Sequence, residues 1–340
     1  ANIWFISYLI HRVQYVSINN YNSQHNLVKY GVPLGAVLEP LLFLIYINDL
    51  SESLYFSNCH HFADDTNILY SNKSLKKINK HMNYDMVQIC HWLRANKISL
   101  NGSKTELIIF RTKQMNITKK LNFRLSGQKL KINESVNYLG ITLDKFLSLD
   151  NHINKLKLKL TRANGLLAKI RYYVNEKTLQ VLYHSLFHSN LLYGLDIWGQ
   201  SKAMISRHLQ KLQDKVMRIL SFKLPYQYVA PIYSKLNVLK VTDHVFLNNC
   251  LFVYDCLNKK VPHVFLDYYN TTLQQHQHNT RGVNRQTIIL PQANTKCYGR
   301  ESFIFQSSLN RNSLSTNLGI NTQTLSRTQL LLKTKLWLLN

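Results

Sequence analysis

Asp64 and Asp65 are the residues of this sequence best suited to bind a metal ion. They join two short apolar runs within residues 60–70, which predicts a β-hairpin with both carboxylates at its tip. Adjacent carboxylates repel each other unless a cation lies nearby, and hard divalent cations such as Mg²⁺ prefer oxygen ligands. Such a site suits two-metal phosphoryl transfer. Taken alone, however, an Asp-Asp pair is more often ordinary turn chemistry.

The segments around this pair are predicted to alternate between turns, helices and strands. Gly31 to Gly35 contains glycine and proline and predicts an irregular turn. Residues 38–47 predict a helix with Pro40 in its first turn, where the missing N–H is harmless. Apolar residues at three- and four-residue steps predict an amphipathic helix over 75–93. Residues 107–110 and 138–143 are strand candidates.

Beyond residue 150 the pattern changes to helices with basic faces. Apolar side chains recur at helical spacing over 153–170 and 205–219, while Lys and Arg occupy the remaining positions. One interpretation is that these faces hold a nucleic-acid backbone; the alternative is a solvated amphipathic surface. The candidate contacts are Lys155, Lys159, Arg162, Arg207, Lys211 and Lys215.

The charge balance favours a polyanionic partner. The chain has 42 Lys and Arg against 17 Asp and Glu, a formal net charge of +25. The second half, from residue 151, holds 25 of the basic and only 7 of the acidic residues. An enzyme of small metabolites does not need this excess, whereas a protein that follows a phosphate backbone does. A basic surface that only improves solubility is the alternative.

Cysteine usage and hydropathy narrow the class of protein further. None of the five cysteines forms a Cys-x-x-Cys pair, so a zinc knuckle is not expected. We expect the cysteines to be reduced, intracellular thiols. The most apolar run, 41–47, is too short to span a bilayer. We therefore expect an intracellular protein, nuclear and cytoplasmic, with no membrane partner; the oligomeric state is left open.

Several ordered motifs resemble reverse transcriptases of non-LTR retrotransposons of the jockey and CR1 kind. Gly31-Val32-Pro33-Leu34-Gly35 and the helix after it resemble the family's nucleotide-site turn, and Phe62-Ala63-Asp64-Asp65 resembles its metal-binding hairpin. The likeness covers nearly the whole chain and is loose after residue 220. It continues through Trp92-Leu93, Asn96-Lys97, Lys104-Thr105-Glu106, Tyr138-Leu139-Gly140-Ile141, Asp150-Asn151-His152-Ile153 and Tyr193-Gly194.

The resemblance implies a role for each matching residue. Asp64 and Asp65 would bind Mg²⁺, with Mn²⁺ as a substitute, and Asp64 is the expected direct ligand. Lys104 would protonate or steady the leaving pyrophosphate; a solvated lysine beside Glu106 is the alternative. The expected partners are an RNA template, a DNA primer and deoxynucleoside triphosphates. The residues expected to shape the nucleotide and template site are Gly31, Pro33, Gly35, Phe62 and Ala63, with a core role favoured for Phe62.

Three residues depart from the family pattern in the turn segment. Leu34 stands where Gln is usual and lacks its hydrogen-bonding amide. Ala36 lacks a common hydroxyl, and Glu39 replaces a glycine with a charge that a helix N-terminus tolerates. The family's other metal-binding Asp lies on a strand before the segment that matches Trp4 to Leu9, which would place it before Ala1. On that basis the chain alone is expected to be inactive.

The fold expected is α+β: a partial right-hand polymerase palm followed by a mainly helical thumb and C-terminal region. Residues 1–150 would form the fingers and palm, 151–270 the thumb, and 271–340 a polar region ending in an amphipathic tail. The function expected is RNA-directed DNA polymerisation by two-metal nucleotidyl transfer. The alternatives are a catalytically dead nucleic-acid-binding remnant of such an element and an unrelated basic helical protein with accidental motifs. The ordered motifs argue against the last.

Overall fold

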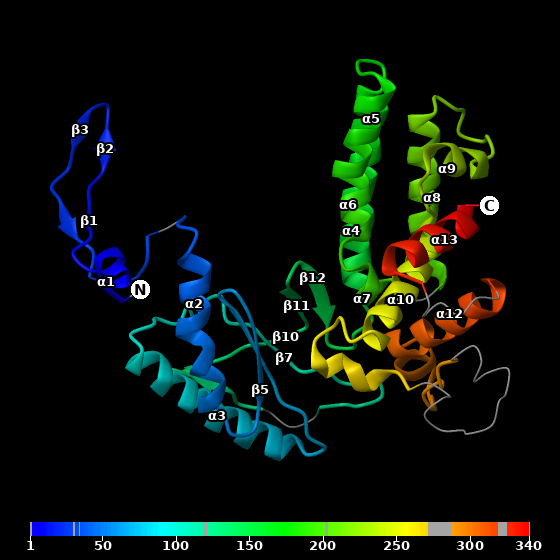
Figure 1. Cartoon of the computed structure of the whole chain (residues 1–340). Coiled ribbons are helices and arrows are strands. Elements are labelled where there is room, and N and C mark those ends of the chain that lie inside the picture. The colour runs from blue at the N-terminus through cyan, green and yellow to red at the C-terminus, as the bar shows by residue number, and fades with distance from the viewer. Residues whose placement is uncertain are drawn as a thin grey trace. The chain divides into compact units, whose positions relative to one another are not determined.

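The computed structural model describes residues 2–29, 31–33, 35–117, 121–200, 203–270, 287–318 and 325–339. It combines short strands with many helices, so the α+β class is confirmed (Figure 1). Contacts divide the chain into two compact units. Unit 1 comprises Ala1–Ile109 and Lys113–Asn133, and unit 2 comprises Phe110–Thr112 and Glu134–Asn340. Among the described helices, none is both long enough and apolar enough to cross a membrane.

Within its described residues, unit 1 has three helices, a 3-10 turn and five two-stranded pieces of sheet. Antiparallel pairing joins β1 to β4, β2 to β3, β5 to β6 and β8 to β9, and β7 pairs with β10 in parallel. The elements are α1 (Asn2–Leu9), β1 (Val13–Gln14), β2 (Ser17–Ile18), β3 (Tyr21–Asn22), β4 (Asn26–Leu27), α2 (Glu39–Ile47), the 3-10 turn Asn48–Ser53, β5 (Asn58–Phe62), β6 (Asp65–Leu69), α3 (Leu75–Ala95), β7 (Leu107–Ile108), β8 (Arg124–Leu125), β9 (Gln128–Lys129) and β10 (Ile132–Asn133).

Helix α3 is the centre of unit 1. Its predicted apolar stripe is confirmed, because Met82, Met86, Ile89 and Leu93 are all buried. Met82 and Met86 pack in one small cluster around Phe123, and Ile89 and Leu93 pack in another beside the 3-10 turn. Alternate three- and four-residue steps put these side chains on one side of the helix. Both clusters therefore depend on α3.

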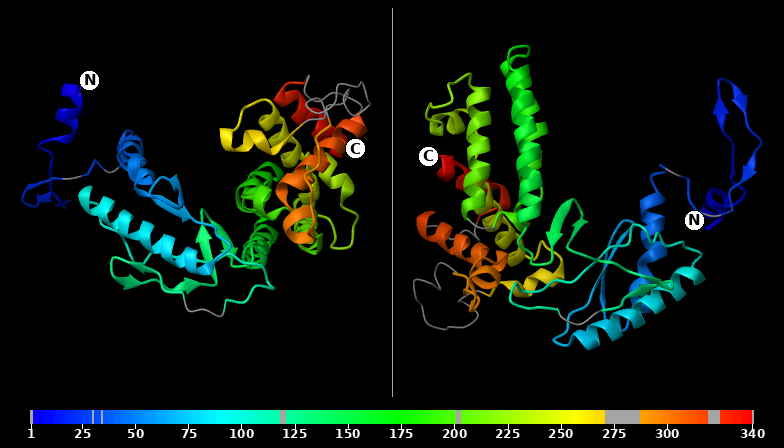
Figure 2. Two further views of the ribbon diagram at one scale, coloured as in Figure 1. Left: turned by 90° about the horizontal axis from the view of Figure 1, so that it is seen from below. Right: turned by 180° about the vertical axis from the view of Figure 1, so that it is seen from behind.

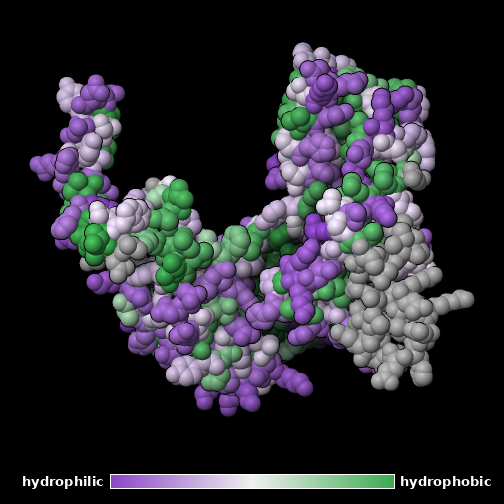
Figure 3. Space-filling model, viewed as in Figure 1, coloured by the Kyte–Doolittle hydropathy of each residue, from purple (hydrophilic) through white to green (hydrophobic). Residues whose placement is uncertain are grey.

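Helix α2 leaves much of its apolar surface exposed. Leu41 is 54% exposed and Ile45 is 65% exposed, although both are apolar side chains. Only Ile47, at the end of the helix, is buried. The space-filling view shows hydrophobic residues gathered at the surface over α2 (Figure 3). Unit 1 thus leaves part of the apolar surface of α2 uncovered.

Unit 2 begins with a β-hairpin and continues as helices, as the change of pattern near residue 150 predicted (Figures 1 and 2). Helices α4 and α8 pack against each other, and α10 packs against α12 and α13. The elements are β11 (Ser135–Tyr138), β12 (Ile141–Asp144), α4 (Asp150–Ile170), α5 (Glu176–Tyr183), the π-helical turn His184–His188, α6 (Ser189–Leu192), α7 (Leu195–Trp198), α8 (Ala203–Leu220), α9 (Ala230–Leu236), α10 (Val241–Leu257), the 3-10 turn His263–Tyr268, the π-helical turn Lys296–Arg300, α12 (Phe303–Leu318) and α13 (Arg327–Leu339).

One large apolar cluster holds α4, the α5–α6 segment and α8 together. Leu160, Leu167, Phe187 and Leu209 are fully buried in it. The stripe expected over 153–170 is confirmed by this burial. A buried leucine or phenylalanine contributes roughly 1.5–3 kcal/mol to the free energy of unfolding. The cluster therefore gives unit 2 a continuous core, which unit 1 lacks.

A single strand was expected over residues 138–143. The segment instead contains the end of β11, a two-residue turn and the start of β12, which form a β-hairpin. β11 pairs with β12 around Leu139 and Gly140, whose φ angles of 46° and 77° are left-handed. The Tyr193 hydroxyl donates a 2.6 Å hydrogen bond to the carbonyl of Leu139. Gly194 has a left-handed φ of 63°, and a Cβ there would press on the Ile141 side chain, so backbone and packing both favour glycine. The hairpin turn at Leu139-Gly140 and the Tyr193-Gly194 motif, which are far apart in the sequence, are therefore in direct contact.

Asp144 links this hairpin to the start of α4. Its carboxylate accepts N–H bonds from Phe146 at 2.9 Å and Leu149 at 2.8 Å, and a hydroxyl bond from Ser148 at 3.0 Å. Burial by itself raises the pKa of Asp144, but these donors outweigh burial and hold its pKa below the usual value. Asp144 is therefore a structural carboxylate.

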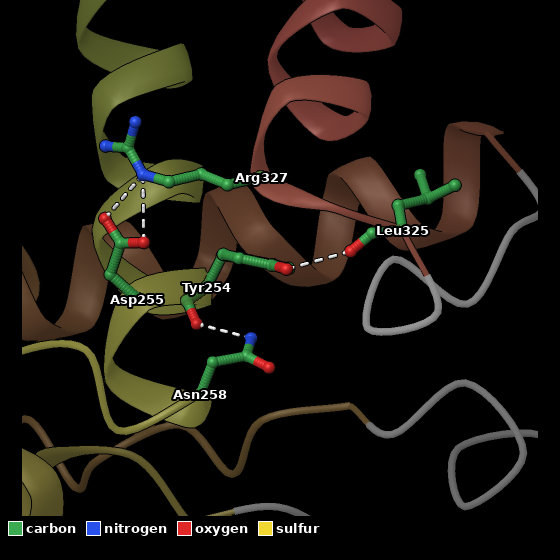
Figure 4. A network of polar contacts seen from close by, with 5 residues as sticks. All are labelled: Tyr254, Asp255, Asn258, Leu325 and Arg327. Atoms are coloured by element: carbon green, nitrogen blue, oxygen red, sulfur yellow. Dashed lines mark hydrogen bonds and ion pairs between the residues drawn. The ribbon is translucent and has the colours of Figure 1, made fainter.

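The last helix is fastened to α10 by polar contacts (Figure 4). Arg327 donates to both carboxylate oxygens of Asp255 at 2.9 Å, and the Tyr254 hydroxyl donates to the carbonyl of Leu325 at 2.9 Å. Leu330 is fully buried in the cluster that α10, α12 and α13 share. The C-terminal segment 325–339 therefore belongs to the core of unit 2. The polar stretch 271–286 lies outside the described residues.

Candidate metal and nucleic-acid site

The predicted Asp64-Asp65 hairpin is present as β5 and β6. Phe62 pairs with Asp65, so Ala63 and Asp64 form a two-residue turn and Asp65 is the first residue of β6. Ala63 has a left-handed φ of 52°. Two-residue hairpin turns require positive φ, and a residue with a Cβ is strained there by about 1–2 kcal/mol. A strained alanine thus turns the chain at the acidic tip.

Both carboxylates of the tip are exposed and have no partner within the described part of the chain. No side-chain hydrogen bond or ion pair joins the carboxylate of Asp64 or Asp65 to another described residue. Exposed carboxylate oxygens are the donor type that Mg²⁺ and Mn²⁺ prefer. No cluster of three or more His, Cys, Asp or Glu side chains suited to a metal occurs among the described residues. The tip accordingly offers two oxygen-donor side chains.

Asp85 on α3 anchors the hairpin at the opposite end from the tip. It is fully buried, and its carboxylate accepts the backbone N–H groups of Tyr55 at 3.0 Å, Phe56 at 3.1 Å and Ser57 at 2.8 Å. These three residues immediately precede β5. Asp85 therefore fixes where β5 begins, and the strand register then fixes the tip. Sequence reasoning missed this residue, although a carboxylate one position before Met86 in an apolar stripe was a visible signal.

The inner face of the hairpin is held by a second set of contacts. His61 Nε2 lies 3.2 Å from Cys59 Sγ, and its Nδ1 lies 3.1 Å from Thr66 Oγ1 on the opposite strand. Burial, followed by the neighbouring His60, lowers the pKa of His61 and so favours the neutral ring. A neutral imidazole can bridge a donor and an acceptor. His61 is thus suited to rigidify the strands beside the tip.

Phe62 does not have the core role favoured from sequence, and that expectation is wrong. The ring is 61% exposed because β-strand alternation places it on the uncovered face of the hairpin, opposite Asp65. Cys59 and His61 occupy the covered face instead. Phe62 and Asp65 therefore present an aromatic ring and a carboxylate side by side.

The turn before α2 is built as its glycines predict. Gly31 and Gly35 have left-handed φ angles of 83° and 78°, which favour glycine. The Ala36 N–H donates to the carbonyl of Pro33 at 3.2 Å. The Arg12 guanidinium donates to the carbonyl of Gly31. Leu34, whose departure from the usual Gln was noted, lies outside the described residues.

Glu39 has a definite partner in this turn. Its Oε2 accepts the N–H of Gly35 at 2.6 Å, so the charge tolerated at the helix start also closes the loop in front of it. The Gly35 N–H is therefore already occupied. A ligand that used this N–H would have to displace the Glu39 carboxylate.

Lys104 lies in an exposed turn of unit 1. Its own N–H donates to the carbonyl of Asn101 at 3.1 Å, and its ammonium forms no ion pair with a described residue. The neighbouring Glu106 accepts a bond from Asn133 at 3.2 Å. Lys104 and Glu106 form no ion pair, so the pyrophosphate role and the solvated lysine both stay predictions.

The basic residues of α4 and α8 belong to unit 2. Lys155 donates to Thr142 Oγ1 at 3.0 Å, which ties its ammonium to β12. The remaining five candidates are exposed and form no ion pair with a described residue: Lys159, Arg162, Arg207, Lys211 and Lys215. Their positive charge is thus uncompensated within the described structure.

Comparison with known proteins gives a family match for the first part of the chain. A family model described as reverse transcriptase (RNA-dependent DNA polymerase) matches residues 2–143. An RNA-directed DNA polymerase from mobile element jockey of Drosophila melanogaster is 25% identical over 248 residues, covering 70% of this chain and 27% of that protein. A probable RNA-directed DNA polymerase from transposon BS of the same species is 27% identical over 257 residues, again covering 70% and 27%.

A third relative points the same way. The probable RNA-directed DNA polymerase from transposon X-element of Drosophila melanogaster is 27% identical over 215 residues, with 59% of this chain and 22% of that protein covered. The chain thus spans about a quarter of the length of these curated relatives. No solved structure matches. Residues 2–143 are therefore a reverse transcriptase domain, and the chain is distantly homologous to the jockey, BS and X-element polymerases of retrotransposons.

Proposed function

We propose that this chain is part of an RNA-directed DNA polymerase that adds deoxynucleotides to a primer 3′-hydroxyl on an RNA template. The observation that carries the proposal is the pair of unpartnered carboxylates on the β5–β6 turn, within a reverse transcriptase domain. Residues 1–150 would supply fingers and palm, and 151–270 would act as a thumb. The partners would be template, primer and deoxynucleoside triphosphates.

Asp64 and Asp65 would hold divalent metal through their exposed oxygens. Mg²⁺ or Mn²⁺ bound there would supply alignment of the attacking oxygen and neutralisation of phosphate charge. Asp64 lies in the turn itself and is the better placed direct ligand, while Asp65 pairs with Phe62 in the strand ladder. The role of this chain is to hold both oxygens in place, through the strand register and through Asp85.

The turn from Gly31 to Gly35 would shape the nucleotide and template side of the site. Its left-handed glycines let the backbone approach a ligand because they carry no side chain. Chain neighbours apart, no described atom lies within 4 Å of where either Cβ would be. Phe62 and Ala63 would line the acidic tip beside it. Lys104 would donate charge or a proton to the leaving pyrophosphate from its exposed turn.

The first test measures metal binding and needs no activity. Mn²⁺ titration followed by electron paramagnetic resonance should show binding that Asp64→Asn lowers by about tenfold or more, because a neutral amide replaces an anionic ligand. Asp49→Asn is the matched control, since Asp49 is also exposed and in unit 1. Equal Mn²⁺ binding by wild type and Asp64→Asn would contradict the assignment.

The second test is primer extension on an RNA template with Mg²⁺ or Mn²⁺. We propose that the 340-residue chain alone extends a primer poorly, because its described residues bring only two carboxylates to the tip. Fusion to the upstream polymerase segment of a related element should raise extension, and Asp64→Asn in the fusion should abolish it. Robust extension by the unfused chain would contradict the first statement; extension that survives Asp64→Asn would contradict the metal site.

A nucleic-acid-binding remnant without turnover is the second candidate. The uncompensated cations of α4 and α8 favour binding whether or not the tip is complete. Each phosphate contact releases condensed counterions, so affinity for a duplex should fall steeply with salt. The variant Lys159→Ala/Lys211→Ala/Lys215→Ala should flatten that slope by about 1 per lysine removed. An unchanged slope would exclude these lysines as contacts.

A further inference from the structure

Five exposed aromatic residues lie on the two connections that follow α4 and α8. Tyr172 is 68% exposed and Tyr173 is 88% exposed directly after α4. Phe222 is 48%, Tyr226 81% and Tyr228 79% exposed in the connection from α8 to α9. We call these five residues the aromatic tip. Single exposed aromatics need no explanation, but five on neighbouring connections at the ends of two packed helices do.

The two connections touch through aromatic and cationic contacts. The rings of Tyr172 and Phe222 meet edge to face with centroids 6.1 Å apart. The Arg171 guanidinium lies 4.6 Å from the centre of Tyr172 and 5.4 Å from the centre of Phe222. Its Nε has no hydrogen-bond partner in the described part of the chain. The two rings, together with the Tyr172 hydroxyl, therefore hold Arg171 without any carboxylate.

The second connection is held in a defined shape. Phe222 has a left-handed φ of 53°, and the Lys223 N–H donates to the carbonyl of Arg218 at 2.9 Å. Arg218 Nε donates to the carbonyl of Gln227 at 2.9 Å, and the Gln227 side chain accepts the N–H of Leu224 at 3.1 Å. Tyr226 and Tyr228 flank this anchored glutamine. Their rings project from a fixed backbone and make no ring contact with a described residue.

The charge around the aromatic tip is positive. Lys169, Arg171 and Lys177 lie on the first connection or beside it, with Glu176 as the nearby acid. Lys223 lies on the second connection, where residues 221–229 contain no acid. The exposed lysines form no ion pair with a described residue. Aromatic rings interleaved with unpaired cations complement unpaired bases joined by phosphates.

We propose that the aromatic tip stacks on unpaired bases of a single-stranded nucleic acid, whose phosphates meet the cations around it. This rests on the proposed function, because the same strand would continue along the basic faces of α4 and α8. A tyrosine ring offers its π-face to every base, so binding at the aromatic tip does not depend on the nucleotide sequence. Bases already stacked within a duplex are not accessible to it. The aromatic tip would therefore distinguish single strands from duplexes.

The test compares oligonucleotide affinities of the full chain by fluorescence anisotropy. The variant Tyr173→Leu/Tyr226→Leu/Tyr228→Leu removes three rings that contact no other described ring. Stacking contributes enough per base that affinity for single-stranded RNA or DNA should fall by at least about fivefold. Affinity for an abasic oligonucleotide of equal length and for a duplex should stay unchanged. The Tyr→Phe variant at the same positions should bind like wild type, because it keeps the rings.

Two controls separate this inference from the proposed function. Tyr21→Leu removes an 83% exposed tyrosine from unit 1 and should leave every affinity unchanged. Lys159→Ala/Lys211→Ala/Lys215→Ala should lower affinity for single strands, abasic strands and duplexes alike. If the lysine variant weakens binding but the leucine variant does not, the aromatic tip is excluded and the basic faces stand. If wild type binds no nucleic acid, both fail. The RNA and DNA arms show which single strand is preferred.

Discussion

The two units of this chain reach order by different routes. Unit 2 packs α4, α5, α6 and α8 around one continuous apolar cluster. Unit 1 arranges short hairpins and turns around the single helix α3 and leaves several apolar residues of α2 exposed. The carboxylate tip belongs to the unit with the smaller core. Hydrogen-bonded register and one buried carboxylate position the tip in unit 1, whereas in unit 2 a packed apolar core supports the helices that carry the cations.

The largest expected effect follows from the core of unit 2. Phe187 is fully buried, so Phe187→Ala should lower the free energy of unfolding of unit 2 by about 3–5 kcal/mol. Phe62→Ala is the matched control, because that ring is 61% exposed, and it should cost less than about 1 kcal/mol. Hydrogen exchange measured by mass spectrometry follows each unit separately. If both variants lowered the free energy of unfolding by similar amounts, burial of Phe187 in the core of unit 2 would not set it apart from the exposed Phe62.

The next effect concerns Asp85 in unit 1. Asp85→Asn removes the charge and one acceptor from a site where three N–H groups converge, which should destabilise unit 1 by about 2–3 kcal/mol. Amide exchange in β5 and β6 should accelerate while that in α4 and α8 stays constant. Asp49→Asn changes an exposed carboxylate and is the control. Unchanged protection of β5 in Asp85→Asn would show that the hairpin does not depend on this anchor.

Unit 2 should also be the more acid-sensitive unit. Burial is the main cause that lowers the pKa of His244 to about 3, and the charges of His188 and Lys335 add to it. Burial likewise lowers the pKa of His188 to about 4, with added effects from His184 and Lys335. The unfolded chain binds these protons near the usual pKa of 6.5, so stability is lost as pH falls from 6.5 toward these folded pKa values. At about pH 5 the loss at His244 should be roughly 2 kcal/mol.

Denaturant unfolding of unit 2 at several pH values tests this sign. The variant His244→Gln should flatten the decline in stability below pH 6.5, because glutamine does not titrate. His208→Gln on α8 is the control, since His208 is exposed. A stability that rises as the pH is lowered, or a decline that His244→Gln leaves intact, would contradict the buried neutral histidine.

The smallest effect lies at the turn before α2. Glu39→Ala removes the acceptor of the Gly35 N–H and should cost about 0.5–1.5 kcal/mol locally. Faster exchange of the Gly35 amide is the readout, and Glu52→Ala, which changes an exposed glutamate, is the control. Glu39→Gln should restore part of the protection, because an amide oxygen still accepts. An unchanged Gly35 exchange rate would show that the turn closes without Glu39.

The sequence pattern was most informative where one local rule decides the structure. The steps from Met82 to Leu93 required one buried helical face, and α3 buries it. The glycines at 31 and 35 predicted a turn and adopt the left-handed φ that makes glycine useful there. The Asp64-Asp65 hairpin follows from alternating runs around a turn. The divisions at residues 150 and 270 stay predictions, as do the chemical roles of the site residues.

Other features depend on residues far apart in the sequence, and local patterns do not contain them. Phe62 looked like a core residue because it is apolar, but which face of a hairpin is covered depends on what packs there. Glu39 looked like a tolerated charge until the fold of the turn brought the Gly35 N–H to it. Lys155 was grouped with the other basic residues of α4 as a nucleic-acid contact, but in the folded chain its ammonium donates to Thr142 on β12.

The sequence alone thus determined the residue types and local elements of this protein: a carboxylate turn, a glycine turn and basic amphipathic helices. Tertiary structure alone decided that Asp85 anchors β5, that Gly194 lies against Ile141, and that aromatic rings from two separate connections meet around Arg171. The physical reason is range. Periodicity and turn preference act over a few neighbouring residues, whereas burial and hydrogen-bond partnership depend on contacts that close only when distant segments pack.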